Sequence, residues 1–255
     1  MEVLVEVRPP LGFVTLNRPE SLNTFNVPLA EKLNQALIDL DNDSNVRVVI
    51  IRAEGKNFSA GIDLKEFFNK DARALRDFIK LMDMHNHTIA KMKKPVIASI
   101  RGYVLANGAG LTLASDFAIA SENAKIGTTA IKVGLACLGP GVVLSRCVGR
   151  KKALEMVLLG EWIDAREALR LGIVNRVVSD GKLEEETEKF ALELAEKNPL
   201  ALELAKRCIY VAEDLPYDQA LNYASELFTF LAGTEDAKEG IRAFLEKRKP
   251  VWRGR

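Results

Sequence analysis

Two short, continuous apolar runs constrain most strongly how this chain can fold. Residues 46–52 and 95–100 are rich in β-branched side chains, too short for a helix and too uniformly apolar for a half-exposed strand. They therefore predict strands that are covered on both faces. Further strands are expected at four places, residues 3–7, 12–16, 117–120 and 173–178. Most of these runs are separated by segments long enough for a helix, and this alternation predicts an α/β fold.

Helical periodicity fills the segments between the predicted strands. Leucines recur at helical spacing in residues 28–40, and helices are also expected over residues 71–91 and 151–159. From Gly181 onward helical periodicity takes over, so we place a boundary near Glu196. This divides the chain into a core, residues 1–195, and a helical region, residues 196–255. The helical region carries more apolar surface than a small appendage could bury alone, which predicts packing on the core or on another subunit.

Composition excludes several classes of protein. With 36 Lys and Arg against 35 Asp and Glu, the net charge of +1 gives no global field that would attract nucleic acid or a membrane surface. No apolar stretch approaches the roughly 20 residues that span a bilayer, and the N-terminus lacks a signal pattern, so a cytoplasmic location is expected. The 3 cysteines show no CxxC spacing, so neither a disulfide framework nor a metal site is expected.

A glycine-flanked loop follows each of the two buried strands. Residues 55–64 read GKNFSAGIDL, residues 102–110 read GYVLANGAG, and each loop leads toward a helix. At a strand-to-helix transition, free backbone N–H groups meet the positive end of a helix dipole. Small residues let a substrate approach the main chain, and two convergent N–H groups can stabilise a carbonyl oxygen that gathers negative charge. The loops therefore predict an oxyanion site.

The first of these loops carries the segment FSAGIDLK at residues 58–65, which is followed by KPVIA at residues 94–98 and by the second loop. This series resembles the crotonase superfamily, the enoyl-CoA hydratase/isomerase family, and further matching segments follow the family's order along almost the whole chain. The resemblance implies an α/β fold built as a spiral of ββα turns, with a C-terminal helical trimerisation region. It also implies an acyl-CoA substrate and a homotrimer or dimer of trimers. Coenzyme A then belongs to the substrate, and no separate cofactor is expected.

The resemblance also implies the residues of the site. The two oxyanion donors fall on the backbone amides of Ala60 and Asn107. The family usually has glycine where Asn107 stands, so Gly108 is an alternative donor. Eight residues are expected to contact the substrate and its CoA arm: Ser21, Leu22, Ala60, Gly61, Ile62, Asp63, Lys65 and Gly108. In the family's pattern Asp63 has a structural role, which leaves its carboxylate out of the chemistry.

The acid and base of the hydratase branch are missing. That branch uses two glutamates, and this chain has Gly110 and Ala130 at the matching positions. The oxyanion site would remain, because it depends on main-chain groups, but a proton carrier must come from elsewhere. Asp83 is one candidate, although it could simply pair with His87 four residues on. Cys137 is another, although a small buried apolar cysteine is its simpler interpretation.

Three functions remain open on this basis. The first is a lyase or isomerase of the hydratase/isomerase type with an unusual acid/base set. The second is decarboxylation of a malonyl-type CoA, or thioester hydrolysis, on the same oxyanion site; decarboxylation needs no base, because loss of CO2 forms the enolate directly. The third is a CoA-binding protein that has kept the fold without the chemistry.

Overall fold

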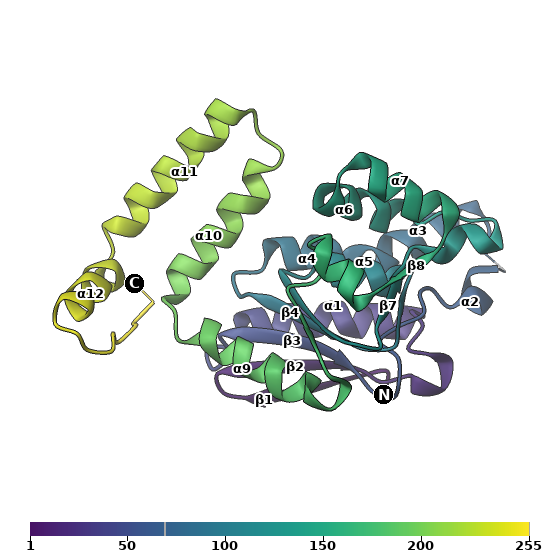
Figure 1. Cartoon of the computed structure of the whole chain (residues 1–255), viewed down its shortest axis with the longest axis horizontal. Helices are drawn as coiled ribbons and strands as arrows, with labels where there is room; N and C mark the ends of the chain where they lie inside the picture. The colour runs from purple at the N-terminus through teal and green to yellow at the C-terminus, as the bar shows by residue number, and fades with distance from the viewer. Residues whose placement is uncertain (69, 255) are drawn as a thin grey trace.

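A six-stranded sheet forms the centre of the chain in the computed structural model, which describes residues 1–68 and 70–254 (Figure 1). The strands lie in the order β1-β2-β3-β4-β6-β9, where β1 is Val3–Arg8, β2 is Leu11–Leu16, β3 is Val48–Ala53, β4 is Val96–Ile100, β6 is Phe117–Ser121 and β9 is Arg176–Val178. All six predicted strands are present, but the last starts at Arg176 rather than at Ile173.

The sheet is parallel except at its first pair. Strands β1 and β2 run antiparallel, whereas β2, β3, β4, β6 and β9 pair in parallel. Because β3 and β4 are neighbours and run in the same direction, their carboxyl ends lie at one edge of the sheet. The loops that follow them are therefore brought together. The segments that precede the same two strands lie at the opposite edge.

Both faces of the sheet are covered, as the apolar runs predict. Val49 and Ile51 of β3 belong to a large core that also contains the buried leucines of helix α1. The alternate residues Val48 and Ile50 belong to a second core, against Leu183 and other residues of helix α9. Successive side chains of a strand point to opposite faces, so one continuous apolar run supplies both cores.

A smaller sheet was not predicted. It has three strands in the order β5-β7-β8, which are Tyr103–Leu105, Lys125–Gly127 and Trp162–Asp164. Each has only 3 residues, which is too short for any period-2 pattern to stand out in the sequence. Strand β5 lies within the second glycine-flanked loop and thereby holds that loop in place.

Helices connect the strands and follow the core. Their bounds are α1 Val27–Asn42, α2 Leu64–Phe68, α3 Ala72–Met82, α4 Met84–Lys91, α5 Asn107–Ala114, α6 Leu138–Val148, α7 Arg150–Leu159, α8 Ala165–Arg170, α9 Leu183–Ala195, α10 Pro199–Ala212, α11 Tyr217–Ala232 and α12 Glu235–Leu245. Short 3-10 turns occupy Pro19–Ser21, Thr129–Val133 and Asp180–Lys182. The single helix expected over residues 71–91 is instead two, because the chain turns at Asp83, which ends α3 and begins α4.

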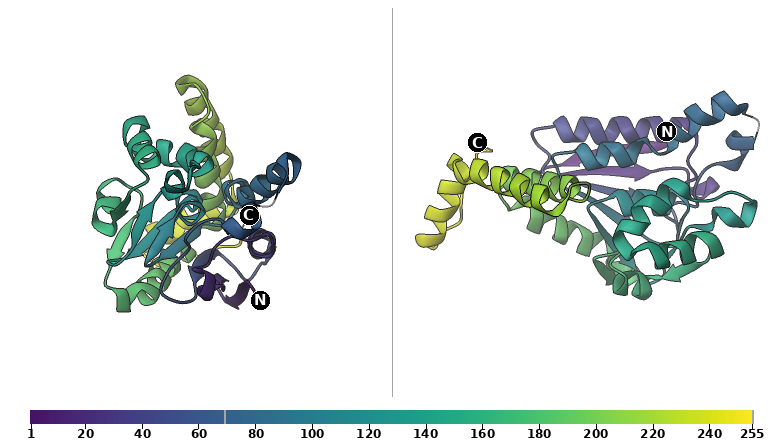
Figure 2. Two further views of the ribbon diagram at one scale, coloured as in Figure 1. Left: turned by 90° about the vertical axis from the view of Figure 1, so that its right-hand side faces the viewer. Right: turned by 90° about the horizontal axis from the view of Figure 1, so that it is seen from above.

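The last helices project from the core. Helix α9 packs on the sheet, whereas α10, α11 and α12 extend away from it (Figures 1 and 2). Helix α11 has no buried residue. Within residues 1–68 and 70–254, no helix is both long and apolar enough to cross a membrane.

Candidate active site

The two glycine-flanked loops join along a short stretch of backbone pairing. Ser59 forms a parallel bridge with Val104, in which the Leu105 amide donates to the Ser59 carbonyl at 2.8 Å. Gly61 has a φ of +109°, and a Cβ added there would lie 2.7 Å from the Ala106 Cβ and 3.6 Å from the Asn107 nitrogen. Only glycine allows both this backbone conformation and this close approach. The loops therefore fit together through Gly61.

The free backbone amide in the first loop is that of Ile62 rather than that of Ala60. The Ala60 amide donates to the Leu22 carbonyl at 3.0 Å, so the prediction that it serves as an oxyanion donor is wrong. Ile62 forms a parallel bridge with Phe25, in which the neighbouring Gly61 carbonyl and Asp63 amide make the hydrogen bonds. In such a bridge the central residue's own N–H points to the other side. Among the described residues no acceptor takes the Ile62 amide.

A second free backbone amide lies at the start of α5. Asn107 is the first residue of this helix, so its N–H has no partner within the helix, and no other described residue accepts it. Asn107 lines the cavity described below and Gly108 does not, which favours Asn107 over its neighbour. The buried Asn107 side chain donates from Nδ2 to the Met82 carbonyl at 2.9 Å. This bond ties the second loop to the junction of α3 and α4.

A cavity of about 770 Å³ opens beside the two free amides. Its volume lies within the range of small-molecule sites. Most of its lining is apolar and comes from the first loop, α2, α3, the start of α5 and the segment before α6. Its lining includes Ile62, Asn107, Asp83, Thr129, Ala130 and Cys137.

The positions that would carry the hydratase glutamates bring no carboxylate to this cavity. Ala130 lines it with a methyl group. Gly110 lies under Pro140, and a Cβ added at Gly110 would be 3.0 Å from the Pro140 Cγ. A glutamate at residue 110 would therefore need Pro140 to move.

Asp83 is the one cavity-lining carboxylate among the described residues. It lies at the turn between α3 and α4, half-buried, with its carboxylate against the Cα of Gly139. No described residue donates a hydrogen bond to this carboxylate, and the predicted ion pair between Asp83 and His87 does not form. Burial raises the pKa of Asp83, and the charge of His87 opposes this only in part. A carboxylate with a raised pKa is better suited to accept a proton from carbon.

Cys137 lies in the same cavity but is poorly suited to chemistry. Burial raises the pKa of its thiol, which disfavours the reactive thiolate. His85 is fully buried beneath the site, and burial lowers its pKa to about 4, so its imidazole is neutral at physiological pH. Neither group is available as a proton carrier in the cavity. Of the predicted candidates, Asp83 alone combines position with a favourable pKa.

The remaining predicted contact residues fall into two groups. Asp63 is structural, because its carboxylate binds Arg18 at 3.1 Å and also accepts the Lys65 amide. Gly108 supports the loops, since a Cβ there would lie 2.5 Å from the Ser59 carbonyl oxygen. Of the eight, Ala60 and Ile62 line the cavity, and six lie outside its lining: Ser21, Leu22, Gly61, Asp63, Lys65 and Gly108. Their contact with a CoA arm stays a prediction.

Two cations at the cavity were missed in the sequence. Arg76 and Lys80 of α3 line the cavity, and neither forms an ion pair with a described residue. They are four residues apart, which places them on the same face of a helix, and this spacing is the only sequence feature that could have predicted that they lie together. Among residues 1–68 and 70–254, no group of three or more His, Cys, Asp or Glu side chains is placed to hold a metal.

Comparison with known proteins places this chain in a family. Residues 9–255 match the family model described as enoyl-CoA hydratase/isomerase. The chain is 36% identical to the (E)-benzylidenesuccinyl-CoA hydratase of Thauera aromatica, with 100% of both chains covered. It is 35% identical to the mitochondrial enoyl-CoA hydratase domain-containing protein 3 of Xenopus laevis, over 94% of this chain and 82% of that one.

Comparison with solved structures supports the same family. The enoyl-CoA hydratase of Bacillus anthracis superposes with a TM-score of 0.95 at 32% identity, over 100% of both chains. The predicted crotonase-like α/β fold with C-terminal helices is thereby confirmed. The chain belongs to the enoyl-CoA hydratase/isomerase family, whose members process acyl-CoA thioesters.

Proposed function

We propose that this protein moves the double bond of an enoyl-CoA, with Asp83 as the single proton carrier. The observation that carries the proposal is one uncommitted carboxylate, of raised pKa, in the same cavity as two uncommitted backbone amides. Isomerisation needs only one such group, because the base that removes a proton from one carbon can return it to another. Hydration needs a second group, to hold and deprotonate water.

The amides of Ile62 and Asn107 bind the thioester oxygen. Asp83 removes a proton from C2 of a 3-enoyl-CoA, and the electron pair delocalises onto the thioester oxygen as a dienolate. The protonated Asp83 then returns the proton to C4, which yields the conjugated 2-enoyl-CoA and regenerates the carboxylate. Each amide contributes about 3 kcal/mol to stabilising the dienolate. The apolar lining excludes water from the intermediate.

The test follows conversion of a 3-enoyl-CoA by the absorbance of the conjugated thioester. We expect Asp83→Asn to lose about 10²- to 10⁴-fold in kcat while staying folded. Cys137→Ala is the matched control from the same cavity and should retain activity. Undiminished isomerisation by Asp83→Asn would overturn the proposal. Rapid hydration of crotonyl-CoA without isomerisation would do the same.

Decarboxylation of a carboxylated acyl-CoA is the second candidate. The unpaired side chains of Arg76 and Lys80 at the cavity favour it, because they can bind a carboxylate on the acyl group. Release of CO2 from methylmalonyl-CoA, unaffected by Asp83→Asn, would support this reaction instead. Binding of acetyl-CoA with no turnover of any of these thioesters would support a non-catalytic role.

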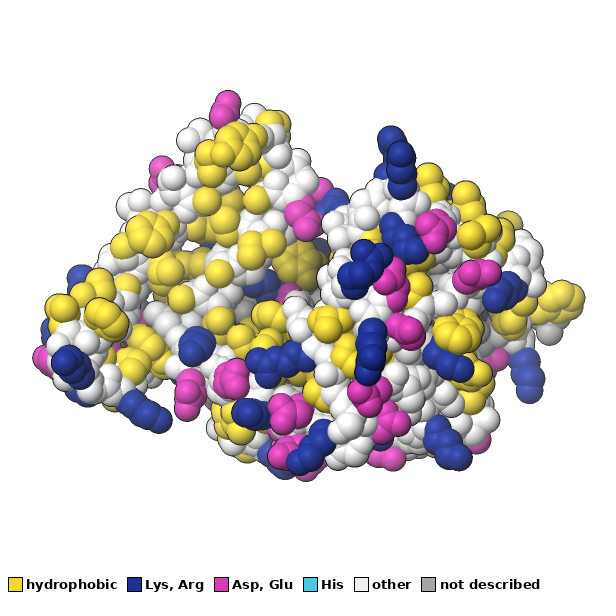
Figure 3. All heavy atoms as spheres, viewed as in Figure 1, with side chains coloured by type: hydrophobic (Ala, Val, Ile, Leu, Met, Phe, Trp, Pro, Cys, Tyr) yellow, Lys and Arg dark blue, Asp and Glu magenta, His cyan; other side chains and the backbone are white. Residues whose placement is uncertain are grey.

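A homotrimer or dimer of trimers is proposed from the exposed apolar residues of the C-terminal helices. Phe228 is 71% exposed, Phe244 is 81% exposed, and no residue of α11 is buried within the chain. Hydrophobic side chains gather along these helices on the face drawn in Figure 3. Burying such a surface requires a partner, and a second copy of the chain supplies the same surface. The cytoplasmic location remains a prediction.

A further inference from the structure

A second pocket lies at the opposite edge of the sheet from the acyl-CoA site. It has a volume of about 300 Å³ and is lined by the segments that precede β3 and β4, by the α9–α10 connection with the start of α10, and by residues 252–254 near the C-terminus. Strand β4 has 5 residues, so roughly 16 Å of extended backbone separates its two ends. The pocket is therefore distinct from the acyl-CoA site.

The charges of this pocket are predominantly positive. Five cations line it, from four parts of the chain: Arg47, Lys93, Lys94, Lys197 and Arg253. Among the described residues, Glu203 is the only carboxylate in the lining, and it forms no ion pair with any of them. Asp41 and Asp43 lie close enough to act on Lys94 but do not line the pocket. A net positive cavity in a chain of net charge +1 is a local feature that the composition conceals.

Much of the hydrogen-bonding capacity of these cations is unused. Arg47 donates from Nη1 to the Ala195 carbonyl at 2.9 Å, which holds its guanidinium in place, and no described residue accepts its other N–H groups. Lys94 donates from Nζ to two carbonyls, those of Leu40 and Asp43, and retains one hydrogen. Burial lowers the pKa of Lys94, because the charged ammonium has lost part of its hydration. A bound anion would offset this unfavourable desolvation.

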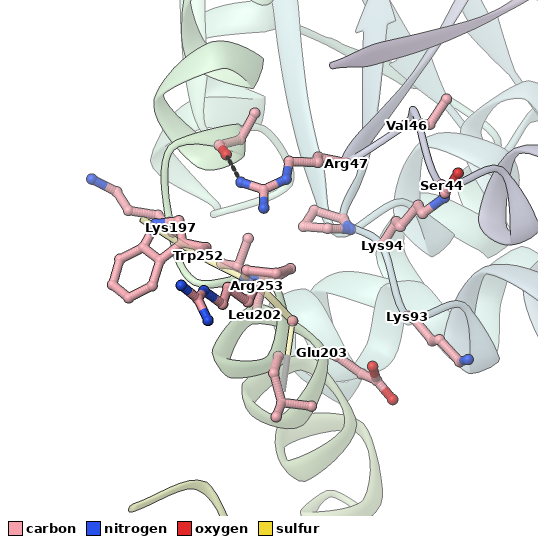
Figure 4. Close-up of a pocket in the computed structure, with 15 residues that line it drawn as sticks. Ser44, Val46, Arg47, Lys93, Lys94, Lys197, Leu202, Glu203, Trp252 and Arg253 are labelled. Atoms are coloured by element: carbon pink, nitrogen blue, oxygen red, sulfur yellow. Dashed lines mark hydrogen bonds between the residues drawn. The ribbon is translucent and has the colours of Figure 1, made fainter. Parts of the chain in front are cut away.

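The side chains border one space from opposite sides. Arg47 enters from the core side, with Trp252 and Arg253 across from it, whereas the ammonium ends of Lys93 and Lys197 point away from this space (Figure 4). The Trp252 indole donates to the Glu196 carbonyl at 2.7 Å, and the Arg253 amide donates to Asp236 at 2.8 Å, so the tail is fixed in this position. Donors that approach from several directions suit a tetrahedral dianion better than a planar carboxylate.

We propose that this pocket is a binding site for a phosphate group, held chiefly by Arg47 and Arg253. The walls come from the core and from the C-terminal tail, so a bound phosphate ties the tail to the sheet. The ligand stabilises the folded chain by mass action and leaves the acyl-CoA cavity free. The volume fits inorganic phosphate or one phosphate group of a small metabolite.

Trp252 supplies the signal for the test. The chain has 2 tryptophans, so Trp162→Phe leaves Trp252 as the only one, and its fluorescence is followed during titration with inorganic phosphate at constant ionic strength. A saturable change is expected, together with a rise in Tm. Calorimetric titration of the unaltered chain provides a second measurement of the same binding.

Two variants and a control decide the outcome. Arg47→Gln and Arg253→Gln should each weaken phosphate binding about 10-fold or more, the effect of losing a charge-assisted hydrogen bond. Arg253→Gln retains its backbone bond to Asp236, so its fold is not in question. Arg207→Gln, on α10 outside the pocket, should bind phosphate as the parent does. A response that does not saturate, or that all three variants share, would overturn the proposal.

Discussion

Replacing Gly61 by alanine should lower the activity of this protein by more than the accompanying loss of stability explains. Gly61 has a φ of +109°, where an alanine costs about 1–2 kcal/mol. Its Cβ would also lie 2.7 Å from the Ala106 Cβ, whereas carbon atoms pack best at about 3.5–4.0 Å. The two loops must therefore separate by about 1 Å. That movement takes the Ile62 amide out of line with the Asn107 amide.

The loss can be estimated from the role of that amide. One misplaced oxyanion donor costs about 3 kcal/mol of transition-state stabilisation, which is about 10²- to 10³-fold in kcat. The matched control is Gly172→Ala, because Gly172 has a φ of +77° and nothing lies within 4 Å of an added Cβ. This control should lose a similar amount of stability to backbone strain but keep its activity.

The assay compares kcat for 3-enoyl-CoA isomerisation with the free energy of unfolding in urea for both variants. The reasoning is refuted if Gly61→Ala unfolds at the same urea concentration as Gly172→Ala and is just as active. It is also refuted if both variants lose activity equally, because the loss would then follow stability alone.

Three further outcomes are expected. Burial raises the pKa of Asp83, so isomerase activity should fall as the pH drops through that pKa, which a pH–rate profile measures. The ionised carboxylate is the disfavoured form, so Asp83→Asn should become more stable than the parent as the pH rises through the same pKa, which urea unfolding at a series of pH values measures. Lys206→Met should lower the free energy of unfolding in urea by about 3–5 kcal/mol, because the Asp116 carboxylate, which lies 2.7 Å from Lys206 Nζ, stays buried without its cation. The double variant that also carries Asp116→Asn should recover most of this loss. Phe228→Asp with Phe244→Asp should lower the mass measured by light scattering to that of smaller species, and an unchanged mass would count against the proposed oligomer.

The sequence predicted the central sheet because its signals are local. The runs that end near Arg52 and Ile100 are apolar at nearly every position, on both faces of the strand, and this pattern needs no knowledge of distant residues. The same holds for the helix expected over residues 151–159, which is α7 and ends at Gly160 in a left-handed conformation. The break between α3 and α4 at Asp83 was not visible, because residues 71–91 keep their helical composition throughout.

The site was predicted less completely, for physical reasons. The choice of Ile62 over Ala60 depends on which amides pair with Leu22 and Phe25, and those contacts cross almost 40 positions in the chain. Whether Asp83 faces a cavity depends on the turn that the helix prediction missed. The phosphate pocket combines segments that lie more than 100 residues apart, as the bond between Arg47 and Ala195 shows. No local pattern carries such information.

The most direct test of the proposed mechanism is a crystal structure of the Asp83→Asn variant with a bound 3-enoyl-CoA. We expect the thioester oxygen within about 3 Å of both the Ile62 and the Asn107 nitrogen atoms, with the residue 83 side chain beside C2 and C4 of the acyl group. A thioester oxygen bound by other groups, or an acyl chain that leaves residue 83 out of reach, would contradict the mechanism.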